Sequence, residues 1–327
     1  MKIELKSLAK FLFRILITAV LLWLVFSRID LEQLGQSVKA ARWQFLLIVW
    51  VLAVLAFWTR AVRMHFILKR QDCNVGSIKI FGASAVTMLY SLMIPGLLST
   101  GVKWYILRQH TGKGSNVLSS MAYNQATEIV VRVLLGLVAI IVTNPGGQPQ
   151  LPVICTIVTA GIIIGCVLLL NRRTGVKVNE LMGYALRPFP KVIRSPAERI
   201  LGQIKIFQTT GWGFHLEMAG ISLLASLLSV VIYIFAAKAA RISVPAAALV
   251  WQSSAVYILG RLPISVANLG VREFTLIEFL ALYGVEAPAV LLMSMIIFSN
   301  TILMAFIGAI YQQFWAISAK KSAQPTG

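Results

Sequence analysis

The sequence predicts an all-α membrane protein that crosses the bilayer several times. Of its 327 residues, 58% are hydrophobic and 13% are charged, and the mean hydropathy is +0.82. Soluble domains are nearer half apolar and a quarter charged. The excess is concentrated in runs long enough to span hydrocarbon. They lie near 10–26, 43–68, 78–97, 117–143, 151–171, 216–237, 245–265 and 287–316. A membrane β-barrel would instead show weak alternating segments of about ten residues, and the sequence has none.

The net charge of +19 fits a membrane protein better than a nucleic-acid-binding one. Lys and Arg accumulate on cytoplasmic loops and favour contact with anionic lipid. No aromatic-basic recognition motif is present, so we expect no nucleic-acid partner. The three cysteines form no CxxC or Cys/His cluster, so we expect neither a metal site nor a disulfide framework. No cofactor is expected either.

The N-terminal region combines a span with a surface helix. The run at 10–26 follows a basic start, as in a signal peptide, but no small-residue cleavage site follows it. We therefore expect an uncleaved span. The stretch 28–42 has mixed charge with apolar residues at near-helical spacing, which predicts a short amphipathic helix lying on the membrane.

Charge asymmetry predicts the orientation. Basic residues mark the N-terminus, the C-terminus and the 172–215 linker as cytoplasmic, whereas 143–150 is uncharged and placed outside. The basic stretch 103–114 also belongs inside, so the run at 78–97 must enter and return. This gives six crossings and two re-entrant hairpins, broken near 95 and 263. Eight simple crossings remain the alternative, but they place 103–114 outside.

The two breaks resemble each other and predict an inverted repeat. MIPGLLSTGVKWYIL (93–107) and RLPISVANLGVREFTLI (261–277) both run from a proline to Gly-Val and a cation. With the flanking runs, the first unit starts outside and the second inside, as in repeats whose broken helices meet near the midplane. The predicted organisation is therefore 1–42, N-terminal span and interfacial helix; 43–143, first repeat; 144–215, connecting span and linker; 216–316, second repeat; and 317–327, tail.

Each break is expected to open a half-helix at Gly-Val-cation. Unwound backbone cannot face lipid, so both breaks must lie in protein or line a wet cavity. Helix N-termini attract anions, and Lys103 and Arg272 would sit in the first turns. We therefore predict an anion site there, with a lipid phosphate as the ligand. Proline and glycine would shape the breaks: Pro95, Gly96, Gly101, Pro263 and Gly270.

Other charged residues inside the apolar runs are also candidates. Arg60 and Arg63 share a helix face, and either bind a lipid phosphate or extend to the headgroups. Glu128 and Arg132 lie four apart, well inside a span, and either serve function or form a structural pair.

The second half-helix adds polar candidates. Glu273 is expected to face away from Arg272, its neighbour in sequence, and either to pair with Lys103 or Arg132 or to carry a proton. Glu278 follows on the same helix. Ser265 and Asn268 would satisfy free backbone groups or contact a head group.

These segments resemble the lysylphosphatidylglycerol synthase transmembrane region family, also called flippase-like. The resemblance is carried by RAVRMHFIL (60–68), MIPGLLSTGVKWYILR (93–108), RVLLG (132–136) and, most specifically, LPISVANLGVREFTLIEFLALYGV (262–285). It covers nearly the whole chain and implies a membrane region that moves or presents a lipid between leaflets. The first break departs from the family's glycine-rich pattern, and Val131 stands where an acid often precedes the arginine.

We therefore expect a lipid translocase rather than an enzyme. No Ser/His/Asp order, HExxH or Walker A motif appears, and no soluble synthase domain follows 316. Without a nucleotide site, transport would be passive or coupled to an ion or proton gradient. The main alternative is a non-transporting partner of a lipid-modifying synthase or glycosyltransferase, docked through the basic linker. A membrane-embedded enzyme is a third possibility. A bacterial inner-membrane location with both termini cytoplasmic is expected, and a homo-oligomer is compatible with the sequence.

Overall fold

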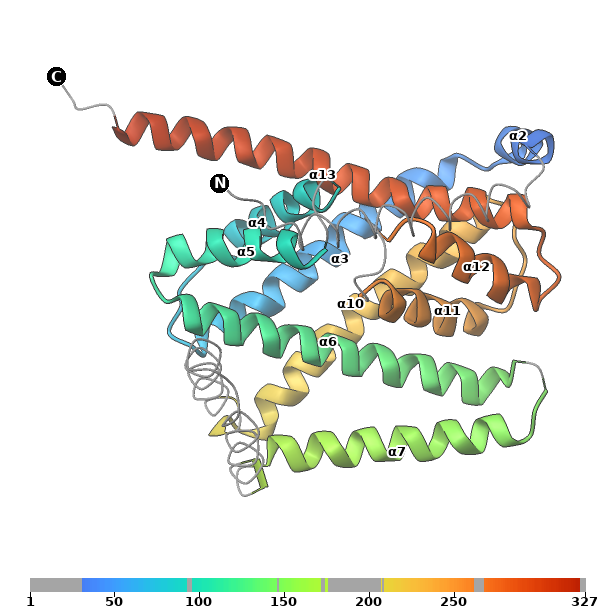
Figure 1. Cartoon of the computed structure of the whole chain (residues 1–327), viewed down its shortest axis with the longest axis horizontal. Coiled ribbons are helices and arrows are strands. Elements are labelled where there is room, and N and C mark those ends of the chain that lie inside the picture. The colour runs from blue at the N-terminus through green and yellow to red at the C-terminus, as the bar shows by residue number, and fades with distance from the viewer. Residues whose placement is uncertain are drawn as a thin grey trace, which may run out of the picture. The chain divides into compact units, whose positions relative to one another are not determined.

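The described secondary structure is entirely helical, which confirms the predicted fold class. The computed structural model describes residues 31–92, 96–145, 147–171, 174–175, 207, 209–261 and 268–323. The predicted run at 10–26 and most of the basic linker lie outside these residues. The labelled helices in Figure 1 are α2 (Leu31–Ala40), α3 (Gln44–Lys69), α4 (Ser77–Ser91), α5 (Gly96–Thr111), α6 (Gly114–Thr143), α7 (Gln150–Leu170), α10 (Trp212–Ala239), α11 (Ala246–Leu259), α12 (Val271–Ala281) and α13 (Ala287–Ala323).

Within the described residues, five helices are long and apolar enough to cross a membrane: α3, α6, α7, α10 and α13. The sixth predicted crossing is the run at 10–26. The helices α4, α5, α11 and α12 have only 15, 16, 14 and 11 residues. A helix needs about 20 residues to span hydrocarbon, so none of these four spans it alone.

The first short pair returns to the side from which it starts. The loop after α3 leads into α4, and the chain after α5 leads into α6. Lys113 Nζ donates to the backbone oxygen of Asp72 at 3.1 Å, and Asn116 Nδ2 donates to that of Gln71 at 3.2 Å. The start of α6 therefore lies beside the start of α4, as the hairpin topology requires and eight simple crossings do not.

The second short pair also doubles back. Trp251 near the start of α11 packs against Phe279 near the end of α12, with ring centroids 4.8 Å apart. The Gln252 amide nitrogen lies 3.4 Å from the Phe279 oxygen, to which it donates. α11 and α12 therefore run antiparallel, and α13 starts on the side where α11 starts.

The helices that precede the two hairpins end in the same way. Asp72 and Arg241 are non-glycine residues in the left-handed region, with φ of 51° and 57°. In α3, Cys73 N–H donates to Leu68 O at 3.0 Å; in α10, Ile242 N–H donates to Ala237 O at 2.8 Å. Both ends are Schellman caps.

The match extends beyond the caps. Three pairs of matching positions are the same number of residues apart in the sequence. They are Asp72 and Arg241, the first residues of α4 and α11, and Lys103 and Arg272. The caps and the predicted Gly-Val-cation alignment therefore agree in register.

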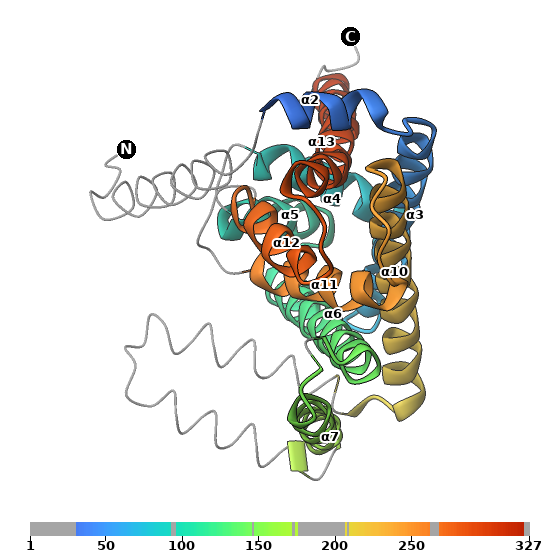
Figure 2. The ribbon, with the colours of Figure 1, turned by 90° about the vertical axis from the view of Figure 1, so that its right-hand side faces the viewer.

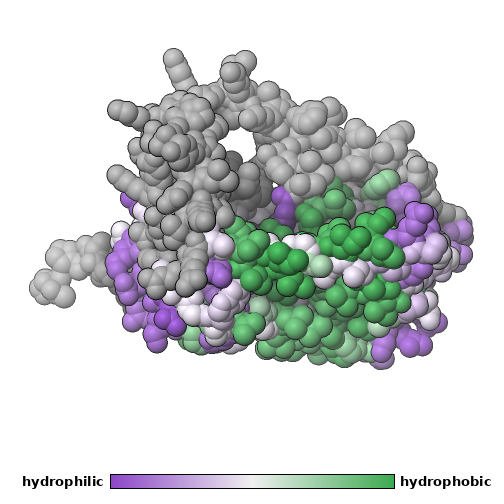
Figure 3. Space-filling view, turned by 90° about the horizontal axis from the view of Figure 1, so that it is seen from below, coloured by the Kyte–Doolittle hydropathy of each residue, from purple (hydrophilic) through white to green (hydrophobic). Residues whose placement is uncertain are grey.

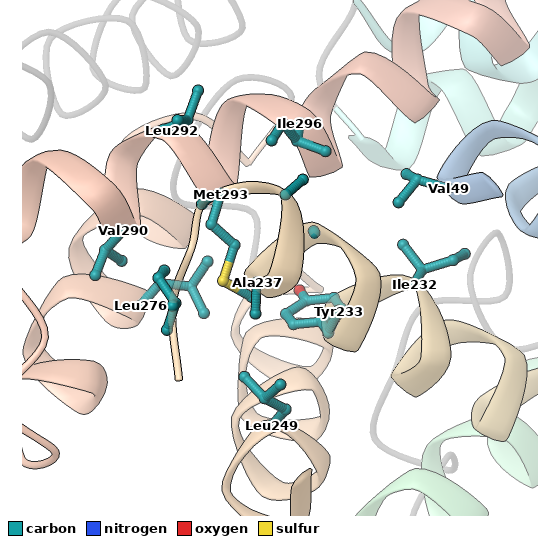
Figure 4. Close-up of a cluster of buried hydrophobic side chains, with 14 of the residues drawn as sticks. Val49, Ile232, Tyr233, Ala237, Leu249, Leu276, Val290, Leu292, Met293 and Ile296 are labelled. Carbon is teal, nitrogen blue, oxygen red and sulfur yellow. The ribbon is translucent and has the colours of Figure 1, made fainter. Parts of the chain in front are cut away.

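The chain forms two compact units: 1–57, 81–103 and 227–327 make the first, and 58–80 with 104–226 make the second. The first unit has an apolar core, shown in Figure 4. Its buried side chains come from α3, α10, α11, α12 and α13, and include Leu276, Leu280 and Met293, each 0% exposed. The short helix α12 thus packs into the core through its apolar face.

The helix α2 packs on protein with its apolar face. Figure 2 shows it lying across one end of α13. Leu34 packs against Leu291, as does the partly buried Ile277 of α12, and Arg42 N–H donates to Ala239 O at 2.9 Å. The predicted amphipathic helix exists, and these contacts fix it to the first unit.

Two glycines permit close packing of α4 on α13. A Cβ on Gly308 would collide with the backbone of Ala85, and one on Gly82 would collide with the ring of Tyr311. Nearby, Gln312 Nε2 donates to Tyr90 Oη at 3.0 Å. This crossing holds the first half of one hairpin against α13.

In the second unit, α7 pairs with α6 and leaves most of its surface uncovered. Its exposed side chains include Ile154, Ile157, Ile164 and Leu168. The face seen in Figure 3 carries a band of hydrophobic side chains with hydrophilic ones at its ends. Apolar surface of this kind fits a helix that faces lipid.

Candidate functional site

Arg63 stands at the centre of a polar network inside the second unit. Its side chain is 0% exposed. Nε donates to Asn124 Oδ1 at 2.8 Å, and Nη2 donates to Asn124 O at 3.3 Å. Nη1 donates to Ser222 Oγ. One guanidinium therefore ties α3 to both α6 and α10, because its planar fork presents donors in several directions.

Glu128 forms ion pairs with two arginines at once. Its Oε2 lies 2.8 Å from Arg63 Nη2, and its Oε1 lies 3.1 Å from Arg60 Nε. The Glu128 side chain is 5% exposed and that of Arg60 is 25% exposed. The spacing predicts a pair of Glu128 with Arg132; the structure shows ion pairs of Glu128 with the two predicted arginines of α3.

Arg132 adds a third cation to this region. It lies one turn beyond Glu128 on α6 and is 3% exposed. The other described acids of the second unit, Asp72 and Glu217, are exposed. This region therefore carries the formal charges of three arginines and one buried carboxylate. All four residues lie on α3 and α6, which are long enough to cross a membrane.

An aromatic cluster lies next to this network. Tyr123, which precedes Asn124, stacks on Phe207 with centroids 4.3 Å apart. Its hydroxyl lies 2.7 Å from His215 Nδ1, and His215 Nε2 lies 3.0 Å from Phe207 O. These contacts join the start of α10 to α6 and fix the position of Phe207.

A second buried ion pair lies at the start of α12. Arg272 and Glu273 are 6% and 4% exposed. Arg272 Nη2 donates to Glu273 Oε1, and Ser294 Oγ of α13 donates to the same oxygen at 2.8 Å. Arg272 Nε also lies 2.8 Å from Ser294 Oγ. The Arg272 guanidinium carbon lies 5.1 Å from the ring centroid of Phe298.

The expectation that Arg272 and Glu273 face apart is wrong. Glu273 folds back along the first turn, where its Oε2 accepts the N–H of Gly270 at 2.7 Å. This N-terminal cap brings its other oxygen beside the guanidinium of Arg272. The carboxylate also takes the place that a bound anion would occupy at this helix end.

The half-helix prediction is correct at the second break and wrong at the first. α12 begins at Val271, directly after Gly270 with φ of 80°. α5 instead begins at Gly96, so Gly101 and Lys103 lie inside the helix. The N–H groups of a helix's first turn have no acceptor within the helix, so a proline, which lacks an N–H, is tolerated at a helix start. Lys103 is half-buried, and its role as an anion ligand stays a prediction.

The remaining candidates are spread over the second hairpin. Asn268 adopts φ of 61° and lies against Gly260, where a Cβ would come 2.6 Å from its Nδ2. The backbone oxygen of Asn268 accepts the N–H of Arg272 at 3.2 Å. Glu278 is exposed on α12. Pro95, Pro263 and Ser265 lie outside the described residues.

Sequence reasoning missed the neutral members of both networks: Asn124, Ser222 and Ser294. Each is a polar residue within a largely apolar helix, and each makes a hydrogen bond with an arginine. Polar residues within a span are rare enough to be a signal, but their partners come from distant segments. Among the described residues, no group of three or more His, Cys, Asp or Glu side chains is placed to hold a metal ion.

Comparison with known proteins agrees with the fold. The family model described as the lysylphosphatidylglycerol synthase TM region matches residues 11–309. No curated protein and no solved structure matches the chain. The matched region includes both hairpins and both buried ion-pair networks. The chain therefore belongs to the lysylphosphatidylglycerol synthase transmembrane region family.

Proposed function

We propose that this protein is a lipid translocase that binds the phosphate of its lipid beside Arg60, Arg63 and Arg132. The observation that carries the proposal is the placement of these arginines near the buried carboxylate of Glu128. The substrate class is a phospholipid or a polyprenyl-phosphate-linked lipid.

Depth makes this cluster unusual. Glu128 lies near the middle of the 30-residue α6, which is about 45 Å long at 1.5 Å per residue. Hydrocarbon is about 30 Å thick, so the cluster falls near the midplane. Charges there are costly, and they commonly mark the path of a polar substrate.

Charge sign selects the ligand. Three arginines with one carboxylate leave a formal excess of two positive charges. A phosphate supplies negative charge and several acceptor oxygens, and arginine binds it with paired hydrogen bonds. At the second cluster the formal charges of Arg272 and Glu273 cancel, so we assign that cluster to holding the hairpin.

The two hairpins would supply the moving parts. The matched Schellman caps at Asp72 and Arg241 support two related repeats. Repeats of opposite direction allow alternating access by motion of one against the other. Movement would be passive or coupled to an ion or proton gradient. From the loop charges, we assign both termini to the cytoplasmic side of the membrane. The membrane that we propose is the bacterial inner membrane.

Reconstitution tests the proposal. The purified chain is placed in vesicles with a fluorescent phosphatidylglycerol, and a membrane-impermeant quencher reports movement between leaflets. Faster movement than in protein-free vesicles is expected. Protein that moves neither this lipid nor a polyprenyl-phosphate-linked analogue, yet co-purifies with a lipid-modifying synthase or glycosyltransferase, would favour the partner role instead.

A further inference from the structure

Arg60 and Arg63 share Glu128 but differ in their surroundings. The Arg63 side chain is 0% exposed and is held by Asn124, Ser222 and Glu128. The Arg60 side chain is 25% exposed. Each arginine uses a different oxygen of the carboxylate, Oε1 for Arg60 and Oε2 for Arg63. Arg63 is therefore enclosed by protein, whereas the Arg60 side chain is partly accessible.

We infer that Glu128 is an internal stand-in for the lipid phosphate, and that the phosphate replaces it at Arg60 while Arg63 keeps it. This inference rests on the proposed function. Oε1 of Glu128 occupies the place of a phosphate oxygen, since carboxylate and phosphate both accept from a guanidinium. Arg60 is then the ligand-facing residue, and Arg63 is a positioning residue that retains Oε2.

The arrangement explains how the site could empty and refill. An arginine with no counter-charge is expensive inside a membrane. When no lipid is present, Oε1 compensates Arg60 at 3.1 Å. When a phosphate arrives, one anionic partner replaces another, and the contacts of Arg63 to Asn124 and Ser222 hold α3 in place. Because the Glu128 carboxylate can replace the phosphate at Arg60, the affinity for the lipid stays low enough for the lipid to leave.

Lipid binding by four proteins tests the inference. Isothermal titration of the purified full chain in nonionic detergent would use dihexanoylphosphatidylglycerol and, in a second arm, geranyl phosphate. These probes separate a phosphodiester source from a phosphomonoester source. Glu128→Gln is expected to bind the preferred probe about tenfold more tightly, which corresponds to about 1.4 kcal/mol. Arg60→Gln is expected to bind at least about tenfold more weakly, and the double variant should match Arg60→Gln.

Controls separate folding from binding. Glu217→Gln, an exposed acid on α10, should bind like the wild type. If Glu128→Gln does not fold, Glu128→Asp keeps the charge beside Arg63 but shortens the reach to Arg60, and tighter binding is again expected. Weaker binding by either Glu128 variant would overturn the inference and leave the translocase proposal standing, as would unchanged binding by Arg60→Gln. Failure of the wild type and every variant to bind both probes would overturn both.

Discussion

Arg63 and Glu128 stand 65 positions apart in sequence, yet Nη2 of one lies 2.8 Å from Oε2 of the other. The same guanidinium reaches α10 through Ser222. Three long helices therefore meet at one buried arginine. A network of this kind holds its members in one arrangement when every donor is used, and it makes Arg63 the residue whose loss the second unit should tolerate least.

Arg63→Lys should destabilise the protein by about 3 kcal/mol, the scale of breaking a buried charged network. Lysine has a single ammonium and cannot reproduce the fork that reaches Asn124, Ser222 and Glu128 together. Thermal unfolding in detergent measures the effect. Lys69→Gln, on the exposed last turn of α3, should change stability by less than about 0.5 kcal/mol. Equal losses in both variants would contradict the assignment.

Glu273→Ala should lower stability by about 3 kcal/mol, because it leaves Arg272 buried without its carboxylate and removes the cap on Gly270 N–H. Glu273→Gln should cost less, since its amide oxygen still accepts from that N–H. Replacing both residues, in Arg272→Met with Glu273→Met, should recover part of the loss. The double variant is compared with the single variants Arg272→Met and Glu273→Met, and additive losses of stability in this cycle would show that the pair is not coupled.

Gly308→Ala should weaken the packing of α4 on α13, because the added methyl would collide with the backbone of Ala85. Gly220→Ala is the matched control: it lies in α10, where an added Cβ would meet open space, and alanine favours a helix over glycine by up to about 1 kcal/mol. Unfolding temperature should fall in the first variant and stay level or rise in the second. A level temperature for Gly308→Ala would argue against the close crossing.

Thiol labelling tests the topology. A membrane-impermeant maleimide applied to cells should label Gln148→Cys directly and Asn74→Cys only after permeabilisation, since both positions are exposed and lie on opposite sides in the predicted orientation. Native Cys73 should stay unlabelled at neutral pH in either case. It is 1% exposed, and burial raises the pKa of its thiol, so little reactive thiolate forms. Direct labelling of Asn74→Cys in intact cells would reverse the orientation.

The sequence carried enough information to predict the spans and the hairpins. Hydrophobic run lengths located the long helices, and the basic 103–114 stretch required the first hairpin to return. The contacts of Lys113 and Asn116 place the start of α6 beside the loop before α4, which is compatible with this topology. Such features are local in the sequence or follow from membrane electrostatics, so they can be predicted without knowing the fold.

The partners of charged residues were less predictable. Spacing placed Glu128 near Arg132, but its contacts to α3 depend on how separate helices pack. Neighbouring side chains diverge on a helix, which predicts that Glu273 faces away from Arg272. A first-turn glutamate that bends back to cap its own helix escapes that rule. The start of α5 is a further case, because the Gly-Val-cation pattern predicts a start at Gly101 and the helix begins at Gly96.

Transport by the Arg60→Gln variant tests the central claim most directly. In vesicles, the initial rate of phosphatidylglycerol movement would be compared among wild type, Arg60→Gln and Lys69→Gln, each with its unfolding temperature recorded. The account predicts that Arg60→Gln stays folded and loses at least about nine-tenths of the rate, equivalent to about 1.4 kcal/mol, while Lys69→Gln keeps it. A folded Arg60→Gln variant that moves lipid at the wild-type rate would contradict the account.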